Sequence, residues 1–340
     1  MKTVIVTGGA GYIGSHACKA LHQAGYLPVT YDNLSQGNET AVRWGPLVVA
    51  DISDRAELDR TIARYQPVGA MHFAAFTSVA ESVTDPRKYY RNNVAGALTL
   101  FEAACAGGLK AVIFSSTAAV YGVPETVSIT ETSELRPINP YGRSKLMMEQ
   151  MLSDFHQAYG LASMCLRYFN AAGADPEGEI GEDHDPETHL IPRALMAASG
   201  EISELDLFGT DYETPDGTAI RDYIHVTDLA QAHVLALRYA LEKGGASQFN
   251  LGTGAGFSVL EIIASVERVT GRKLPVRIAP RREGDPACLV ADPTCAKREL
   301  DFVAHHSDID SIVRTAWRWQ EKKRDRDMQA RKSNASAALP

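Results

Sequence analysis

The sequence predicts an α/β protein with a doubly wound parallel sheet and a smaller α/β substrate-binding domain. Three observations support this prediction: short strand-like segments alternate with helical patterns, a glycine-rich turn follows the first strand, and the composition changes near residue 170. Near-continuous apolar strands separated by helices indicate a parallel sheet that is covered on both faces. Right-handed crossovers make such a sheet doubly wound. The expected strands are residues 3–7, 27–32, 47–51, 69–74, 111–116 and 163–170.

The glycine-rich turn, VTGGAGYIGS, joins the first strand to the first helix. Gly8, Gly11 and Gly14 lack a Cβ, so the backbone can approach a pyrophosphate at the helix N-terminus, as in Rossmann-type sheets. Asp32 closes the second strand, where a carboxylate hydrogen-bonds an adenosine ribose and repels a 2′-phosphate. The sequence therefore predicts NAD as the cofactor. Asp51 closes the third strand and is either an adenine contact or a solvated turn residue.

The amino-acid composition of the chain changes after Asn170. Residues 171–189 are acidic and rich in Gly and Pro, which places a domain boundary there. A long helix is expected over 226–245, capped by Thr227 or Asp228 and stopped by Gly244. The expected units are an NAD-binding Rossmann domain over 1–170 with 221–252 packing back on it, a substrate-binding domain over 171–325, and a disordered tail over 326–340.

Composition and charge narrow the classes of function. The 340-residue chain has a formal net charge of −8, which disfavours a nucleic-acid partner. Its five cysteines form no C-x-x-C pair, which is typical of reduced thiols. No signal segment is recognisable and no apolar run approaches the ~20 residues of a membrane span. We therefore expect a cytoplasmic protein that has no membrane or nucleic-acid partner.

A hydroxyl, a phenol and an ammonium group form the candidate catalytic set. Thr117 follows the strand 111–116, at the sheet edge where ligands bind, and Tyr141 and Lys145 share one face of the next helix. Such a Y-x-x-x-K pair is usually structural, but beside a dinucleotide site it supports proton transfer. A nearby ammonium and a pyridinium ring favour the phenolate, which takes a proton from an alcohol while hydride leaves for the nicotinamide. Thr117 would relay the proton or position the substrate oxygen.

Beyond these patterns, the chain resembles the extended short-chain dehydrogenase/reductases, and within them the UDP-glucose 4-epimerase family, over about residues 1–320. The motifs that carry the resemblance are, in order, TGGAGYIGSH, YDNLSQG, MHFAAF, ESVTDPRKYYRNNVAG, FSSTAAVYG, NPYGRSK, LRYFNAAGADP, GEDHDPETHLIP, DGTAIRDYIHVTDLA, FNLGTG and RREGDP. The resemblance implies a cytoplasmic, homodimeric isomerase of galactose metabolism that binds NAD and acts on a UDP-hexose.

The resemblance also implies a reaction: oxidation at C4′ to a 4-keto sugar, then re-reduction from the opposite face. Dehydratases and decarboxylases of the same superfamily carry an acid just after the active-site hydroxyl, and this chain has Ala118 and Ala119 there. The alanines therefore favour epimerisation of UDP-glucose and UDP-galactose. The alternatives are a 4-epimerase of another UDP-sugar (a pentose, uronate or N-acetylhexosamine form) and a non-catalytic NAD-bound sensor, which an intact Thr117, Tyr141 and Lys145 set disfavours.

The matching motifs assign site residues one by one. For the cofactor they are Gly8, Gly11, Tyr12, Ile13, Gly14, Asp32, Asn33, Asp51, Ile52, Phe73, Ala74, Ala75, Asn92, Lys145 and Phe169. For the substrate they are Thr117, Tyr141, Asn170, Leu190, Phe208, Arg221, Arg282, Asp285 and Leu289. Thr77 departs from the lysine that many relatives carry, so weaker NAD retention is expected. From the residues alone, Arg221 could instead pair with Asp222.

Two further features leave alternatives open. Leu289 falls where this family varies the residue that borders the 2′ substituent of the hexose, but it could equally pack a domain interface. Asp183, His184, Asp185 and His189 have metal-ligand side chains, yet in a Gly/Pro-rich loop we expect a hydrogen-bonded connector and no metal. The chain has no G-x-S-x-G elbow, so a Ser-His-Asp hydrolase is not predicted.

Overall fold

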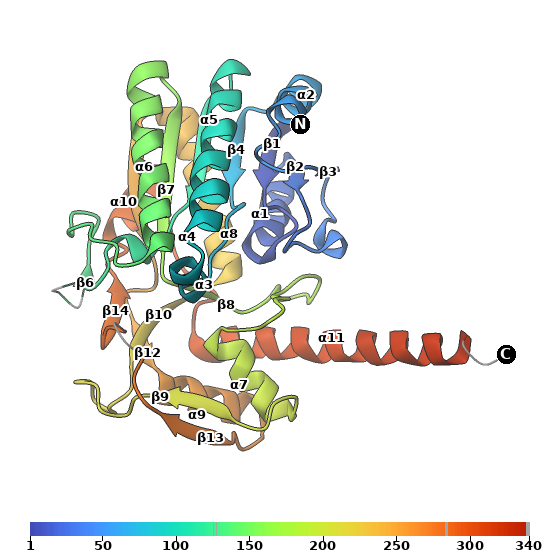
Figure 1. The fold of residues 1–340 in the computed structure, drawn as a ribbon, viewed down its shortest axis with the longest axis vertical. Helices are drawn as coiled ribbons and strands as arrows, with labels where there is room; N and C mark the ends of the chain where they lie inside the picture. The colour runs from blue at the N-terminus through green and yellow to red at the C-terminus, as the bar shows by residue number, and fades with distance from the viewer. Residues whose placement is uncertain (125, 127, 283–284, 338–340) are drawn as a thin grey trace.

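The structure is a computed structural model that describes residues 1–124, 126, 128–282 and 285–337. Figure 1 shows two stacked parts: a large sheet with helices on both sides, and below it a smaller α/β part from which one long helix extends. Within the residues described, no helix combines the length and the apolarity needed to cross a bilayer.

The large sheet has seven parallel strands in the order β11-β7-β5-β4-β1-β2-β3. The predicted doubly wound parallel sheet is confirmed, because the strand order reverses direction at β1 and β4, where ligands of such sheets bind. The strands are β1 (Lys2–Thr7), β2 (Tyr26–Asp32), β3 (Leu47–Val49), β4 (Gly69–His72), β5 (Ala111–Ser115), β7 (Ala162–Tyr168) and β11 (Ala246–Leu251).

Helices cover both faces of this sheet because successive strand residues point to opposite sides. In β1, Val4 and Val6 pack into one apolar cluster and Ile5 into another. The first face carries α1 (Tyr12–Gln23), α8 (Val226–Lys243) and α10 (Thr294–Leu300); the second carries α2 (Arg55–Tyr65), α5 (Ala97–Ala106) and α6 (Pro140–Tyr159). Shorter elements are η1 (Glu39–Ala41), α3 (Val79–Thr84), α4 (Pro86–Tyr89), the π-helix η2 (Tyr90–Gly96) and η3 (Ala118–Val120).

The smaller part contains two further sheets and its own apolar core. One sheet has the order β12-β10-β14-β6, with β8 also pairing with β10, and the other pairs β13 with β9. The strands are β6 (Ser128–Ile129), β8 (Asn170–Ala172), β9 (Leu205–Phe208), β10 (Ile220–His225), β12 (Gly256–Ser258), β13 (Val276–Ala279) and β14 (Cys288–Ala291). The helices are α7 (Leu190–Ser199), α9 (Val259–Thr270) and α11 (Ile309–Ala337).

The segment 221–252 was expected to pack on the NAD-binding domain, but it is divided between the two parts of the molecule. Residues 221–225 lie in β10, which pairs with β8, β12 and β14 of the smaller part, so the return to the large sheet begins at Val226. The reason is long-range strand pairing, which no local pattern reports. The helix begins at Val226, the first residue of the expected range, but its N-cap is His225 rather than Thr227 or Asp228; it ends at Lys243, before Gly244, which has φ 71°.

The end of the chain also differs from the expectation. Helix α11 continues to Ala337, so residues 326–337, predicted to be a disordered tail, are helical; the rest of that tail lies outside the described residues. Seven of the twelve residues from 326 to 337 are Ala, Arg, Lys or Gln, which have high intrinsic helix propensity. Figure 1 shows the helix extending away from both domains.

Candidate active site

The glycine turn forms a cradle of bare backbone. Gly8 has φ +71°, and a Cβ there would lie 2.6 Å from the amide nitrogen of Ala74. A Cβ on Gly14 would lie 2.1 Å from the carbonyl oxygen of Gly8, and Gly11 is the N-cap of α1. Side chains are therefore excluded where the turn meets the helix N-terminus. These residues fit the pyrophosphate of a dinucleotide, which needs close backbone approach and free amide donors.

Asp32 fixes this turn from the end of β2. Its buried carboxylate accepts hydrogen bonds from the backbone amides of Ala10, at 3.0 Å, and Leu34, at 2.9 Å. Each oxygen has a second lone pair to offer a ribose hydroxyl. Asp32 therefore holds the loop in shape and lies at the sheet edge where a ribose contact is predicted.

A cavity of about 520 Å³ lies beside the end of β3, and Asp51 and Asn92 line it. Asp51 accepts hydrogen bonds from Asn33 Nδ2, at 2.7 Å, and from Ser53. Burial alone would raise the pKa of Asp51, but the hydrogen bonds from Ser53 and Asn33 lower it below its usual range. Asp51 and Asn92 thus line one hollow, and Asn33 is hydrogen-bonded to Asp51, as expected of an adenosine site.

The other predicted cofactor residues fall into two groups. Phe73 and Ala74 follow β4 directly beside the glycine turn, and the Phe73 ring packs on His233 with centroids 4.7 Å apart. Two others are held by packing: Ile52 lies in the core beside α5, and Ile13, a residue of α1, lies against the core. Tyr12 is held by a hydrogen bond from its hydroxyl to Gly173 O, at 2.6 Å. The remaining positions are Ala75, half-buried, Phe169, packed against the cluster around η3, and Thr77, exposed.

The three catalytic candidates meet where β5 ends against the first turns of α6. The Thr117 hydroxyl hydrogen-bonds the Tyr141 phenol and accepts from the amide of Ala119 at 3.1 Å. Lys145 Nζ donates to Ser115 O at 2.8 Å and lies 5.9 Å from the centroid of the Tyr141 ring. All three side chains are buried. The structure therefore brings the predicted hydroxyl, phenol and ammonium together.

Burial sets the protonation of this group. It raises the pKa of Tyr141, and the hydrogen bond from Thr117 only partly offsets that rise. Burial also lowers the pKa of Lys145 to about 7, against the opposing pull of Glu149. Burial by itself therefore favours the neutral phenol, and a lysine that is half neutral near pH 7 supplies less charge. The expectation that the ammonium and a bound pyridinium ring together favour the phenolate stays a prediction.

A buried polar network under this group was not predicted. Arg167 Nη2 lies 2.5 Å from Glu149 Oε2, and the two side chains are 4 % and 3 % exposed. Ser116 donates to Glu149, and Arg167 donates to the Tyr121 hydroxyl at 3.0 Å, which in turn donates to Asn250 Oδ1 at 2.7 Å. Two signals were available: Glu149 lies one helical turn after Lys145, and Arg167 is a charge inside an otherwise apolar strand.

The predicted nucleotide residues form two pairs in the smaller part. Arg221 Nη2 pairs with Asp285 and donates to Pro286 O at 2.8 Å, so the alternative pairing with Asp222 is wrong. The Arg282 guanidinium lies 4.1 Å from the centroid of the Phe208 ring.

The other predicted substrate residues lie around these pairs. Asn170 Nδ2 donates to Asp222 O at 3.1 Å, which joins β8 to β10. Leu190 begins α7 and packs on the core of the smaller part. Leu289 lies on β14 beside Arg221 and packs, with Phe169 and Ala118, against the cluster of Val120, Tyr121 and Ile129. It therefore lies close to η3, directly after Thr117.

Comparisons with known proteins show the family to which the chain is similar. Residues 4–252 match the model of the NAD dependent epimerase/dehydratase family. A UDP-glucose 4-epimerase of Rhizobium leguminosarum bv. trifolii is 52% identical over 321 residues, or 94% of this chain and 98% of that protein. A crystal structure of UDP-glucose 4-epimerase from Brucella ovis in complex with NAD has a TM-score of 0.92 at 56% identity and covers 93% of this chain and 98% of that one. The Bifidobacterium longum UDP-glucose 4-epimerase in complex with NAD⁺ and UDP has a TM-score of 0.89 at 39% identity and covers 94% of this chain and 98% of that one.

The fold and site thus define an NAD-dependent sugar-nucleotide enzyme built on a Rossmann-type sheet. The chain belongs to the NAD dependent epimerase/dehydratase family. It is an epimerase-class enzyme whose cofactor is NAD, as the sequence predicted.

The buried ion pair generates a stability prediction. Arg167→Met leaves the Glu149 carboxylate buried without its cation, so the free energy of unfolding should fall by ~3–5 kcal/mol. Urea unfolding checks this value. The double variant Arg167→Met/Glu149→Leu should recover most of the loss, and Arg55→Met, which breaks an exposed pair with Asp59, should change stability by less than ~1 kcal/mol. A double variant as unstable as the single one would contradict the assignment.

The lowered pKa of Lys145 generates a pH prediction. Its pKa in the folded protein, about 7, lies below its ordinary value of 10.5, so between these values the unfolded chain binds more protons and stability rises with pH. The stability of wild type relative to Lys145→Met should therefore increase from pH 7 to pH 9, by at most ~1.4 kcal/mol per pH unit. Urea midpoints of the NAD-free proteins measure it. The exposed Lys273→Met should show a flat difference, and a flat difference for Lys145→Met too would contradict the shift.

Proposed function

We propose that this protein is an NAD-dependent 4-epimerase that interconverts UDP-glucose and UDP-galactose. The observation that carries the proposal is the convergence of Thr117, Tyr141 and Lys145 at the end of β5, on the same edge of the parallel sheet as the glycine cradle that follows β1. The family and the names of the relatives support the same reaction. From the resemblance of the motifs we also infer a cytoplasmic location and a homodimer.

Each catalytic residue has a distinct task in this proposal. NAD, when bound, accepts a hydride from C4′ of the sugar and returns it. The Tyr141 oxygen takes the proton of the C4′ hydroxyl during oxidation and gives it back during reduction. Thr117 orients that phenol through their hydrogen bond. Lys145 is held in place by its hydrogen bond to Ser115 O. When it is protonated, it supplies a positive charge to the same buried site.

The surroundings of the site support epimerisation over elimination. Ala118 and Ala119 follow Thr117 and offer no acid to a 4-keto sugar. Glu149, the carboxylate nearest along α6, is bound by Arg167 and Ser116 and is buried. With no free acid supplied from these positions, the keto sugar has reduction as its productive course, and rotation of the hexose decides which face receives the hydride.

The smaller part supplies the groups that we infer for the UDP moiety. Arg221 and Arg282 present planar donor forks, which suit a diphosphate. Phe208 offers an apolar face beside Arg282, and Asp285 can accept a hydrogen bond from a ribose hydroxyl. Asn170 and Leu190 complete the inferred set at the junction with the large sheet.

Two other functions are separable from this one: 4-epimerisation of a different UDP-sugar, and a non-catalytic NAD-bound sensor. Incubation with UDP-galactose, without added NAD, should yield UDP-glucose in a coupled assay. If the assay yields none, UDP-pentoses and UDP-uronates are tested next. Bound NAD with no turnover of any of these sugars would favour the sensor.

The central test is Tyr141→Phe. The ring keeps its packing and loses only the titrating oxygen, so turnover should fall by more than ~100-fold, within the range expected for loss of a general acid–base group. NAD and UDP should still bind, as calorimetry would report. Retention of a tenth of wild-type activity in the purified variant would rule out Tyr141 as the acid–base residue.

The sugar range generates a second prediction. Leu289 is smaller than a tyrosine and packs beside Ala118 and Phe169, so we expect fast turnover of UDP-glucose and UDP-galactose and slower, detectable turnover of their N-acetyl forms. A steric misfit of this size costs ~1–3 kcal/mol, which is a preference and not a block. Leu289→Tyr should abolish the N-acetyl activity and spare the other. Equal rates on both sugar pairs in wild type, or an unchanged N-acetyl rate in the variant, would show that Leu289 does not set the pocket.

A further inference from the structure

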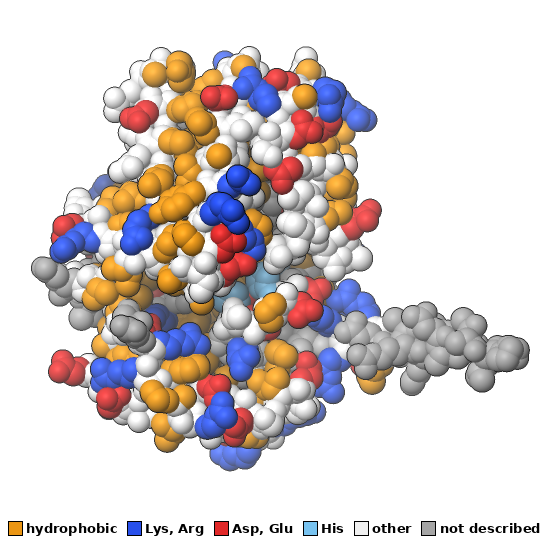
Figure 2. All heavy atoms as spheres, viewed as in Figure 1, with side chains coloured by type: hydrophobic (Ala, Val, Ile, Leu, Met, Phe, Trp, Pro, Cys, Tyr) orange, Lys and Arg blue, Asp and Glu red, His pale blue; other side chains and the backbone are white. Residues whose placement is uncertain are grey.

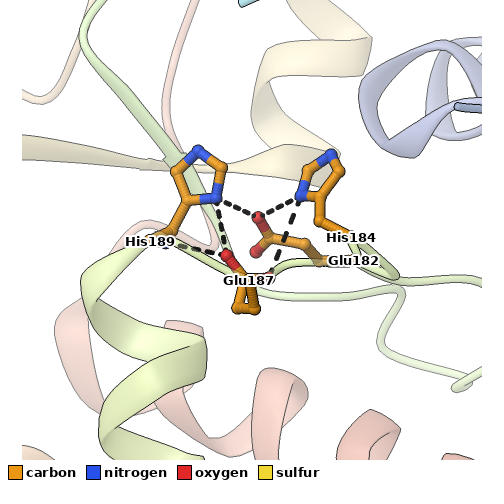
Figure 3. A group of neighbouring side chains, drawn as sticks. All are labelled: Glu182, His184, Glu187 and His189. Atoms are coloured by element: carbon orange, nitrogen blue, oxygen red, sulfur yellow. Dashed lines mark hydrogen bonds and ion pairs between the residues drawn. The ribbon is translucent and has the colours of Figure 1, made fainter. Parts of the chain in front are cut away.

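Four metal-ligand side chains meet in the loop between β8 and α7 (Figure 3). Glu182 Oε1 lies 3.0 Å from His184 Nδ1 and 2.8 Å from His189 Nδ1. Glu187 Oε1 lies 2.9 Å from His189 Nδ1. One ligand atom from each of the four residues lies within 4.8 Å of all the others. The two imidazoles and two carboxylates therefore point at one common centre.

The membership of this group differs from the residues that the sequence singled out. His184 and His189 belong to it, but their partners are Glu182 and Glu187. Asp183 instead forms an ion pair with Lys323 of α11, outside the group.

The two carboxylates are buried without a strong cation. The side chains of Glu182 and Glu187 are 9 % and 8 % exposed, and their ion-pair partners among the described residues are histidines, with no Lys or Arg. Burying two carboxylates together is costly unless a cation compensates them. A protonated imidazole can do so: burial alone would lower the pKa of His189, but the two carboxylates raise it to about 10. Two imidazoles and two carboxylates whose ligand atoms converge are also the donor set of a metal ion, which would displace that proton.

A neighbouring acidic group gives the contrast. Asp175, Glu177 and Glu179 also converge, but Lys19 Nζ lies among them at 2.8, 2.6 and 2.7 Å. That group already holds its cation in the ammonium. The group in the 182–189 loop lacks such a side chain, and the comparison points to an ion supplied from solution.

The donor set selects the kind of ion. Two nitrogens and two carboxylate oxygens suit Zn²⁺, with bonds of ~2.0–2.2 Å and four protein ligands in a structural site. Tetrahedral ligands at that distance are ~3.3 Å apart, and the carboxylate–imidazole separations in the group run from 2.8 to 3.9 Å. Mg²⁺ and Ca²⁺ prefer oxygen ligands alone. The spacing E-x-H-x-x-E-x-H confines all four ligands to one short loop.

The surroundings already orient the ligands. The backbone amides of Thr188 and His189 donate to Glu187 Oε1, each at 2.7 Å. Trp319 Nε1 of α11 donates to Glu182 O at 2.8 Å. The ring of Tyr12, at the start of α1, meets the His184 ring edge to face with centroids 6.2 Å apart. Figure 2 shows histidine side chains at the surface between the two parts of the molecule. The side chains of His184 and His189 are 33 % and 54 % exposed, so a dissolved ion can reach them.

We propose that Glu182, His184, Glu187 and His189 bind one Zn²⁺ ion, which has a structural role. The ion neutralises the two buried carboxylates and fixes the 182–189 loop between α1 of the large sheet and α11 of the smaller part. It takes no part in hydride or proton transfer, because its four positions are filled by protein atoms.

The test is zinc binding by the full chain without a purification tag. The protein is stripped with EDTA, freed of chelator, and titrated with ZnCl₂ and separately with MgCl₂ by calorimetry. We expect one Zn²⁺ per chain and no saturable Mg²⁺ uptake. Loss of outer-shell partners alone weakens metal binding 10–100-fold, so His184→Gln/His189→Gln should weaken it by more than ~100-fold. Zn²⁺ should also raise the melting temperature of wild type and not of the double variant.

Two controls isolate the site. Glu177→Gln removes one carboxylate of the group around Lys19 and should leave zinc affinity unchanged. The double variant keeps all five cysteines, so binding through thiols would persist in it. His184 and His189 are 33 % and 54 % exposed, which favours folding of the variants, and the single change His189→Gln serves if the double one does not fold. No saturable zinc uptake by wild type, or equal uptake by the histidine variants, would overturn the proposal.

Discussion

The buried ion pair between Glu149 and Arg167 is the interaction on which the candidate active site depends. It joins α6 to β7, and Ser116 donates to the same carboxylate from the end of β5. Lys145, one turn earlier on α6, is held by the carbonyl of the preceding residue, Ser115. The last residue of β5 and the residue that follows it are thus fixed to two successive turns of α6. This double attachment fixes the position of Tyr141 relative to Thr117. A shift of α6 along the end of β5 would leave a buried charge unpaired.

A second buried carboxylate sets the distance between the two halves of the site. Asp222 accepts hydrogen bonds from the amides of Thr253, Gly254 and Ala291, at 2.9, 3.1 and 3.2 Å. These bonds fix β10 to β14 and to the turn after β11, so a strand of the smaller part is tied to the edge of the large sheet. The adjacent Arg221 is therefore held at a set place relative to the catalytic group, although it belongs to another sheet.

The sequence was most informative where chemistry and local geometry coincide. Gly8 and Gly14 revealed a backbone cradle, because a side chain there would collide with the turn itself, and the spacing of Tyr141 and Lys145 placed both on one helix face. Contacts between distant segments could not be predicted from the sequence. Both the pairing of Arg221 with Asp285 and the position of 221–225 in the smaller part depend on tertiary packing. The ion pair of Glu149 and Arg167 was not predicted, because neither residue alone indicates that the other lies beside it in the fold.

Burial in the candidate active site constrains how a phenolate can form. It favours the neutral form of Tyr141 and the neutral form of Lys145, so each charge taken alone is unfavourable there. An opposite pair of charges in the same pocket costs less than either charge by itself, since the field of one is cancelled by the other. We therefore expect proton loss from Tyr141 and proton gain by Lys145 to support each other, which would let the buried tyrosine act as the proposed base near neutral pH.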